Sequence, residues 1–126
     1  MKRIAMFLFL TPLLMAATCN GDDHYRDRPC TLEARAGLNI TVSLNGNVNI
    51  TGDGISVTAR DGNYIEDLLN MADTPNFSGA YERPGNYIVT VSKEGYTTYI
   101  SDIIAVQHDY CHVIPRQLSI NLIPEP

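Results

Sequence analysis

Apolar and polar residues alternate along most of the chain beyond residue 37, and this period of two is typical of β-strands with one buried face. Residues 38–44 show the most regular alternation, with leucine, isoleucine or valine at every second position. The same pattern recurs in the segments 48–50, 55–60, 77–81, 87–92, 96–100, 103–106 and 118–122. With turn-forming residues between them, these segments predict about seven short strands in an antiparallel β-sandwich.

Residues 64–71 are ambiguous, because their apolar positions fit either a strand or one or two helical turns. Turn-forming residues bracket the segment closely, at Gly62-Asn63 and at 74–76. We therefore expect a strand that leads into a loop.

Residues 77–96 contain the strongest local signal, which predicts a β-hairpin. Pro84 presets φ for the second position of a turn, and Gly85 suits the third position. A second turn is expected at Gly95-Tyr96. The residues that we expect to define these turns and to pack in the core are Gly79, Tyr81, Pro84, Gly85, Tyr87, Val89, Val91, Gly95 and Tyr96.

The N-terminus has the layout of a secretory signal peptide: two basic residues, an apolar run and small residues before Cys19. The apolar run is shorter than the roughly 20 residues of a membrane-spanning helix. Small residues before a cysteine resemble a bacterial lipobox, and this favours a lipoprotein-type signal at 1–18 and a lipid such as palmitate on Cys19. Cleavage after Ala17, which would leave a soluble secreted or periplasmic domain, is the alternative.

The remaining chain divides at Cys30. Residues 19–29 are polar without a period and are expected to form a flexible tether, and residues 30–126 are expected to form the domain. Asn20 follows the candidate lipid site, which favours the periplasmic side of the outer membrane over the inner membrane. If Cys19 is acylated, Cys30 and Cys111 remain as one pair for a disulfide in an oxidising compartment.

The negative net charge of the chain limits the kinds of molecule that it is expected to bind. The formal net charge is −5, and loss of Lys2 and Arg3 with the leader lowers it by two, to about −7. An acidic domain is a poor ligand for nucleic acid, and it does not dock electrostatically on anionic lipid. The expected contact with the membrane is the N-terminal lipid.

The hairpin region resembles the carboxypeptidase regulatory-like domain, which is a transthyretin-like, seven-stranded Greek-key sandwich. The residues that carry this resemblance are Gly79-Ala-Tyr81, Pro84-Gly85-x-Tyr87-x-Val89-x-Val91, Gly95-Tyr96 and the upstream Ile55-Ser-Val57-Thr-Ala59. Arg60-Asp-Gly62, 80–84 and Cys111-His-Val113 look like parts of small bacterial lipoproteins of unassigned function. The resemblance implies a fold without a catalytic site or a cofactor. The segment 45–54 departs from the family pattern.

Neither catalysis nor metal binding has a local sequence signature. There is no Gly-x-Ser-x-Gly elbow. His108 and His112 are four residues apart, and on a strand this spacing, about 13 Å, is too long for two ligands of one ion. We therefore expect no enzyme activity and no metal site.

The leading hypothesis is a non-catalytic, lipid-anchored module of the bacterial cell envelope with a structural or protein-interaction role. Its expected partner is another protein of the envelope. The alternative is a carbohydrate-binding module, in which the candidates for stacking on sugars are Tyr64, Tyr99 and Tyr110. Any site is expected in the less regular segments 45–54, 61–76 and 107–115.

Overall fold

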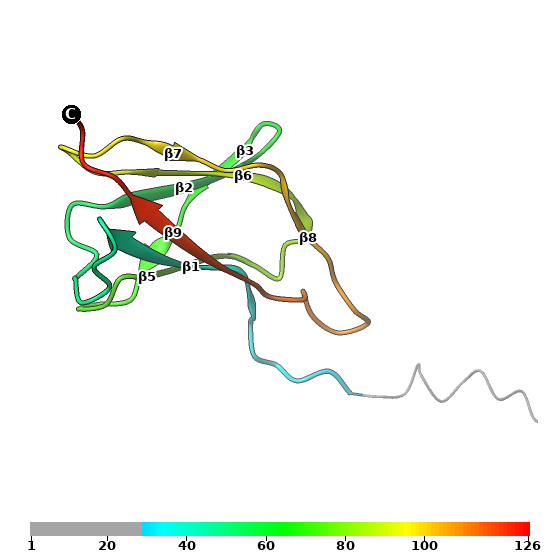
Figure 1. Cartoon of the computed structure of the whole chain (residues 1–126). Coiled ribbons are helices and arrows are strands. Elements are labelled where there is room, and N and C mark those ends of the chain that lie inside the picture. Colours follow the sequence, from blue (N-terminus) through cyan, green and yellow to red (C-terminus); the bar gives the residue numbers. More distant parts are fainter. Residues whose placement is uncertain (1–28) are drawn as a thin grey trace, which may run out of the picture.

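The computed structural model describes residues 29–126, which form two facing β-sheets and no helix (Figure 1). The strands are β1 (Ala36–Leu44), β2 (Ser56–Asp61), β3 (Tyr64–Asp67), β4 (Leu69–Asn70), β5 (Asn76–Tyr81), β6 (Gly85–Ser92), β7 (Tyr99–Ile100), β8 (Ile104–Val106) and β9 (Arg116–Leu122). The predicted all-β class is confirmed. The predicted leader (1–18), Cys19 and the tether up to residue 28 lie outside the described residues.

Four strands form one sheet, here called sheet A, in the order β4-β5-β1-β9. The other sheet, sheet B, has the order β3-β2-β6-β7, and β8 also pairs with β6. All pairs are antiparallel except β1 with β9, which is parallel from Leu38↔Arg116 to Leu44↔Leu122. The expectation of a purely antiparallel sandwich is therefore wrong for this pair, because alternation reports which face is buried and not the direction of the neighbouring strand.

Residues 64–70 are extended, as predicted, but they serve both sheets. Leu68 still donates its N–H to the carbonyl of Val57 in β2, at 2.8 Å, whereas Leu69 pairs with Ser78 of β5. The buried side chain of Leu68 marks the crossing point. The chain thus closes one side of the core by passing from the edge of sheet B to the edge of sheet A.

The core lies between the two sheets. Tyr87 of β6 is its largest fully buried side chain, and Val89 and Val91 on the same face are also fully buried, which confirms the predicted inward face of this strand. The Tyr87 hydroxyl donates to the carbonyl of Arg83 at 2.8 Å and accepts from the Arg83 guanidinium at 2.9 Å. Among residues 29–126, no buried side-chain nitrogen or oxygen lacks a partner.

The predicted hairpin within residues 77–96 is wrong. β5 pairs with β1 and β4 in sheet A, whereas β6 pairs with β2 in sheet B, so the chain crosses between sheets here. The tight turn precedes Pro84-Gly85: the N–H of Arg83 donates to the carbonyl of Ala80 at 3.2 Å. Gly85 opens β6 instead, and a Cβ there would displace the carboxylate of Asp61, which pairs with Arg83 at 3.0 Å.

The placement of Tyr81 in the core is also wrong. Its side chain is 48% exposed, because Ala80 adopts a left-handed backbone with φ of 53°. This conformation interrupts the alternation, so that Ala80 is buried and Tyr81 turns outward. Gly79 is buried, and Tyr96 is partly buried against the core.

The turns are better predicted than the short strands. Asn45 and Gly46 both have positive φ and close a turn between Leu44 and Asn47, and Gly95, with φ of 83°, closes the turn that links Lys93 to Tyr96. However, residues 48–50 form no strand, and 96–100 shorten to β7.

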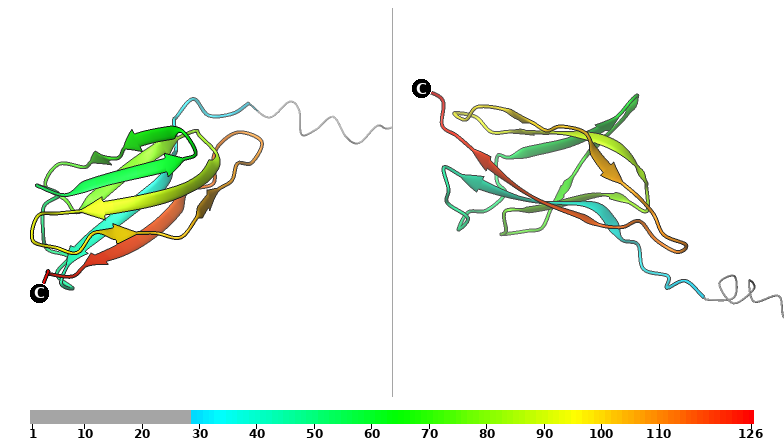
Figure 2. Two further views of the ribbon diagram at one scale, coloured as in Figure 1. Left: turned by 90° about the horizontal axis from the view of Figure 1, so that it is seen from above. Right: turned by 45° about the vertical axis from the view of Figure 1, so that its right-hand side comes forward.

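The two ends of the described chain lie at opposite ends of the sandwich (Figures 1 and 2). The first described residues run beside the loop 107–115, which connects β8 to β9, whereas Pro126 lies at the far end. Within the described residues there is no helix long and apolar enough to cross a membrane.

Candidate functional site

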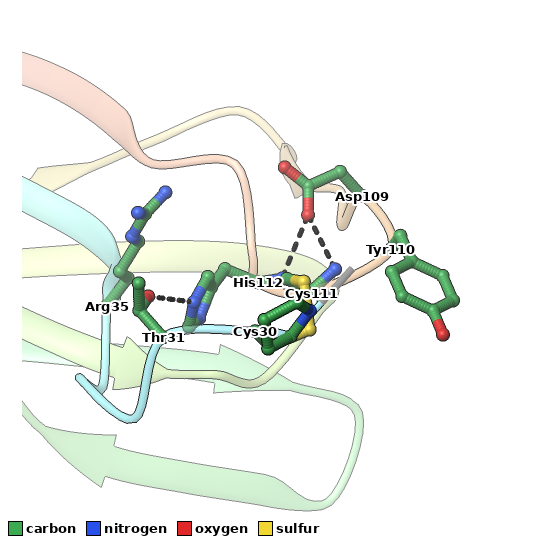
Figure 3. Close-up of a pocket in the computed structure, with 8 residues that line it drawn as sticks. Cys30, Thr31, Arg35, Asp109, Tyr110, Cys111 and His112 are labelled. Atoms are coloured by element: carbon green, nitrogen blue, oxygen red, sulfur yellow. Dashed lines mark hydrogen bonds between the residues drawn. A yellow bond between two sulfur atoms is a disulfide. The ribbon is translucent and has the colours of Figure 1, made fainter. Parts of the chain in front are cut away.

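A cavity of about 320 Å³ lies where the N-terminal segment meets the loop 107–115 (Figure 3). Its lining residues lie outside the strands, since residues 29–35 precede β1 and the loop follows β8. The residues that line it are Pro29, Cys30, Thr31, Arg35, Asp109, Tyr110, Cys111 and His112.

A disulfide joins the two segments at this cavity. Cys30 and Cys111 are bonded at 2.00 Å, and their Cα atoms are 5.3 Å apart. The predicted pairing is therefore observed. Cys30 is exposed and Cys111 is partly buried, so the bond lies at the surface.

Beside the disulfide, His112 joins the same segments by hydrogen bonds. Its side chain is only 7% exposed. The Nδ1 atom lies 2.7 Å from Oε1 of Glu82, and the Nε2 atom lies 2.8 Å from Oγ1 of Thr31 (Figure 3 shows the second contact). Because a carboxylate can only accept, Nδ1 carries a proton and donates it to Glu82. We call Cys30, Thr31, Glu82, Cys111 and His112 the clasp.

Glu82 is the centre of the clasp. Its Oε1 atom also accepts from the backbone N–H of Arg35 at 2.8 Å, and its Oε2 atom accepts from the N–H of Val113 at 3.2 Å. The Arg35 N–H is the main cause that lowers the pKa of the Glu82 carboxyl, and the bonds from His112 and Val113 lower it further. Glu82 lies in the turn Ala80–Arg83, where the chain crosses from sheet A to sheet B; we call this turn the corner between the sheets. Glu82 therefore connects the N-terminal segment, this corner and the loop 107–115.

Asp109 orders the loop itself. Its Oδ1 atom accepts from the N–H groups of Cys111 at 2.8 Å and His112 at 2.9 Å, as drawn in Figure 3. The N–H of His112 and then that of Cys111 lower the pKa of this carboxyl. The side chain of Asp109 thus holds the backbone of Cys111 and His112 in place, and with it the orientation of the disulfide and of the imidazole.

The chain of hydroxyl, imidazole and carboxylate in Thr31, His112 and Glu82 has the order of groups that activates a nucleophile in hydrolases. An oxyanion also needs N–H donors beside the nucleophile. The N–H groups of Cys111 and His112 already donate to Asp109. The arrangement can relay a proton, but these two N–H groups are not available to an oxyanion.

The three tyrosines predicted to stack on sugars do not form one surface. Tyr64 lies on β3 under the guanidinium of Arg83, which is 3.6 Å from its ring centroid, and Tyr99 lies on β7 at the opposite edge of sheet B. Tyr110 points outward from the clasp in Figure 3. Tyr81, which was placed in the core, is exposed on β5.

No metal site is formed by the described residues, since no three histidine, cysteine or acidic side chains between 29 and 126 are placed to hold an ion. His108 and His112 lie in the loop and not on a strand. Nδ1 of His108 is 3.0 Å from the carbonyl oxygen of Asp109.

Of the three segments expected to carry a site, 107–115 contributes to the clasp. Thr31 and Glu82 were not predicted as site residues: Thr31 belongs to no motif, and Glu82 lies in the segment 80–84, which was noted only for its resemblance to small bacterial lipoproteins. The pair Cys111-His112 could have indicated the site, because a histidine that follows a disulfide-bonded cysteine lies close to the segment that carries the partner cysteine.

Comparison with known proteins adds no identification: no protein-family model matches the chain, and no curated protein matches its sequence significantly.

Proposed function

We propose that this protein is a non-catalytic β-sandwich module of the bacterial cell envelope, held at the membrane by a lipid on Cys19, with a structural or protein-interaction role. The observation that carries the proposal is the Cys30–Cys111 disulfide. Structural disulfides belong to exported proteins, which fits the signal-like N-terminus. Pairing of Cys30 with Cys111 leaves Cys19 as the odd cysteine, the position at which a lipid would attach.

The clasp supports this role by its place in the fold. A chain anchored at Cys19 pulls on the domain through residues 20–29, and the force first reaches Cys30. Residues 30–35 belong to no strand, although the carbonyl of Arg35 accepts from the backbone N–H of Glu82 at 2.9 Å. Without the clasp, a pull on this segment would act directly on that bond and on β1. The disulfide transmits this force to the loop 107–115. The hydrogen bonds of Glu82 to Arg35 and His112 transmit it to the corner between the sheets.

We assign the Thr31–His112–Glu82 chain to this mechanical role and not to catalysis. Substitution of Thr31 by valine removes the hydroxyl and is expected to lower stability by about 1 kcal/mol, the usual net contribution of a hydrogen bond. A fluorophosphonate probe, which labels activated hydroxyl nucleophiles, is expected to leave the protein unlabelled. Labelling that disappears in Thr31→Val and His112→Ala would instead assign catalysis to the site.

The proposed fold relationship is to the seven-stranded Greek-key sandwich of the carboxypeptidase regulatory-like domain. Two features support it. β3 and β4 follow each other with only Leu68 between them, and β7 and β8 both pair with β6 at different heights. If each couple is counted as one interrupted strand, the nine strands reduce to seven.

Metabolic labelling with an alkyne fatty acid tests the anchor. The protein is expected to be labelled and to sediment with outer membranes. The Cys19→Ser variant should be unlabelled, and Cys30→Ser/Cys111→Ser, which leaves Cys19 in place, should keep the label. Equal labelling of Cys19→Ser would refute the anchor, and an unlabelled protein in the soluble fraction would identify a secreted or periplasmic domain.

A further inference from the structure

The outer face of sheet A has an unusual composition. Along the central parts of β1, β5 and β9, each outward position carries an amide or a hydroxyl group, while the inward positions are apolar or glycine and lie in or against the core. We call this surface the amide face; its residues are Asn39, Thr41, Ser43, Asn76, Ser78, Gln117, Ser119 and Asn121.

Strand register aligns these side chains in rows. Asn39 lies between Ser78 on β5 and Gln117 on β9. The hydroxyl of Ser78 donates to Oδ1 of Asn39 at 3.1 Å, which orients this amide. The row is held by paired backbones on both sides of β1, so its polar groups need little reordering before they bind a ligand.

The next rows repeat the arrangement. The hydroxyl of Thr41 donates to Oδ1 of Asn76 at 2.8 Å, and that of Ser43 donates to Oδ1 of Asn121 at 2.9 Å. In both Asn76 and Asn121 the side-chain oxygen accepts from a hydroxyl, so the NH₂ group of the amide points away from that hydroxyl. Ser119, which lies beside Thr41, makes no side-chain hydrogen bond with the described residues. Two backbone groups also bind these amides, since Nδ2 of Asn39 donates to the carbonyl of Ala36 at 3.1 Å and Oδ1 of Asn121 accepts from the N–H of Gly46 at 2.8 Å. The second hydrogen of each NH₂ group, together with Gln117 and Ser119, can still pair with a ligand.

A shallow groove of about 250 Å³ crosses the amide face. Met71, which is 57% exposed, lines one part of it, and Gln117, which has no side-chain hydrogen bond to residues 29–126, lines another. The volume is below the roughly 300 Å³ at which pockets for drug-sized ligands begin, and it suits one or two sugar rings. Met71 offers an apolar side chain, and Asn39, Asn76 and Gln117 offer amide groups, to a ligand in the groove.

Charge narrows the class of ligand. None of the eight side chains of the amide face is ionisable, while the chain carries a net charge of −5, which disfavours an anionic glycan or nucleic acid. A protein interface would be expected to contain aromatic or arginine anchors, and none of the eight residues of the amide face is one. The exposed Leu69 and Tyr81 lie beside this set, on β4 and at the end of β5. A neutral polyhydroxylated molecule matches a surface of uncharged donors and acceptors.

We propose that the amide face binds a neutral oligosaccharide, with Asn39, Asn76 and Gln117 as the amide contacts around the groove. This rests on the proposed function, since it gives the envelope module a ligand in place of an unidentified partner. It also moves the sugar site from the dispersed tyrosines to the outer face of sheet A.

The test is a titration of the ¹⁵N-labelled full-length chain in detergent with maltohexaose, cellohexaose and chitohexaose, followed by amide chemical shifts. At least one of these sugars is expected to perturb β1, β5 and β9 and to leave the outer face of sheet B unchanged. Gln117→Ala/Ser119→Ala is expected to bind about tenfold more weakly, which corresponds to about 1.4 kcal/mol.

The matched control is Asn86→Ala/Ser56→Ala, which removes one amide and one hydroxyl from exposed positions on sheet B. This variant should bind like the unchanged chain. The proposal is overturned if none of the three sugars perturbs the spectrum, if the shifts map to sheet B, or if the face responds to protein concentration without sugar, which would identify a second copy as its occupant. None of these outcomes depends on whether Cys19 carries a lipid.

Discussion

Removal of the disulfide is expected to be the most destabilising change at the clasp. The perturbation is Cys30→Ala/Cys111→Ala, which leaves no free thiol in the described domain. The bond spans 81 residues of sequence. A cross-link over a loop of this length lowers the entropy of the unfolded chain by an amount worth about 4.5 kcal/mol at 25 °C. A small domain has only about 5–15 kcal/mol of stability in total, so the loss is a large fraction.

Urea unfolding followed by circular dichroism measures this loss. The variant is expected to unfold at a much lower urea concentration and with a steeper dependence on urea, because its unfolded state is more expanded. For a domain of this size, each kcal/mol lowers the melting temperature by about 4–8 °C, so a fall of roughly 20–35 °C is expected.

The control is the parent protein in reducing agent, which should reproduce the variant once Cys30–Cys111 is broken. A loss below about 1 kcal/mol would refute the reasoning. It would mean that hydrogen bonds of the clasp hold the two segments together even in the unfolded ensemble, or that the loop entropy is offset elsewhere.

Three further changes test single interactions. Because folding lowers the pKa of Glu82, its contribution is present above the ordinary carboxyl pKa of about 4.3 and is lost as the pH falls through the lower folded value; Glu82→Gln should therefore flatten the acid limb of urea midpoints measured against pH, whereas the exposed Glu94→Gln should not. Tyr87→Phe removes both hydrogen bonds of a buried hydroxyl to Arg83 and should cost about 1–3 kcal/mol in urea unfolding, while Tyr99→Phe on an exposed edge should change stability by less than about 0.5 kcal/mol. Gly37→Ala places a methyl group 2.7 Å from Cγ1 of Val106 and 2.9 Å from the carbonyl oxygen of Ala80, and should lower the melting temperature by an amount equivalent to about 1–3 kcal/mol; an unchanged value would show that β1 and β8 can separate there.

Alternation was sufficient to predict the longer strands. In β1, β2, β6 and β9, every second residue is buried or partly buried over most of the strand, because each strand lies with one face on the core and one in solvent. The Cys30–Cys111 pair could be predicted because a secreted layout and an odd cysteine restrict the choices. Both inferences depend on local pattern or on counting, and neither requires knowledge of which strands are neighbours.

Strand partners and the clasp could not be predicted in this way. The segment around Pro84-Gly85 has the sequence of a hairpin turn, yet β5 and β6 belong to different sheets, and only non-local packing decides between a hairpin and a crossing. The prediction that Tyr81 is buried was wrong for a related reason. The left-handed backbone at Ala80 reverses the alternation of buried and exposed side chains, and residue 80 is not a glycine, the residue that usually indicates such a conformation. Thr31 and Glu82 are far apart in sequence and meet at His112 only in the folded chain.

The same corner joins the fold to the site. Ala80 and Glu82 both have left-handed backbones, with φ of 53° and 49°, a conformation that costs a residue other than glycine about 1–2 kcal/mol. Such backbones persist where their surroundings hold them, and Glu82 is held by donors from Arg35, His112 and Val113. The turn at Ala80–Arg83 aims the carboxylate at His112, and the bonds of the carboxylate keep the turn in place. The turn that carries the chain from sheet A to sheet B therefore also positions the carboxylate that holds the N-terminal segment. This double role explains why a charged residue, Glu82, occupies a strained backbone position. It lies at the end of the sandwich on which the proposed membrane anchor would pull.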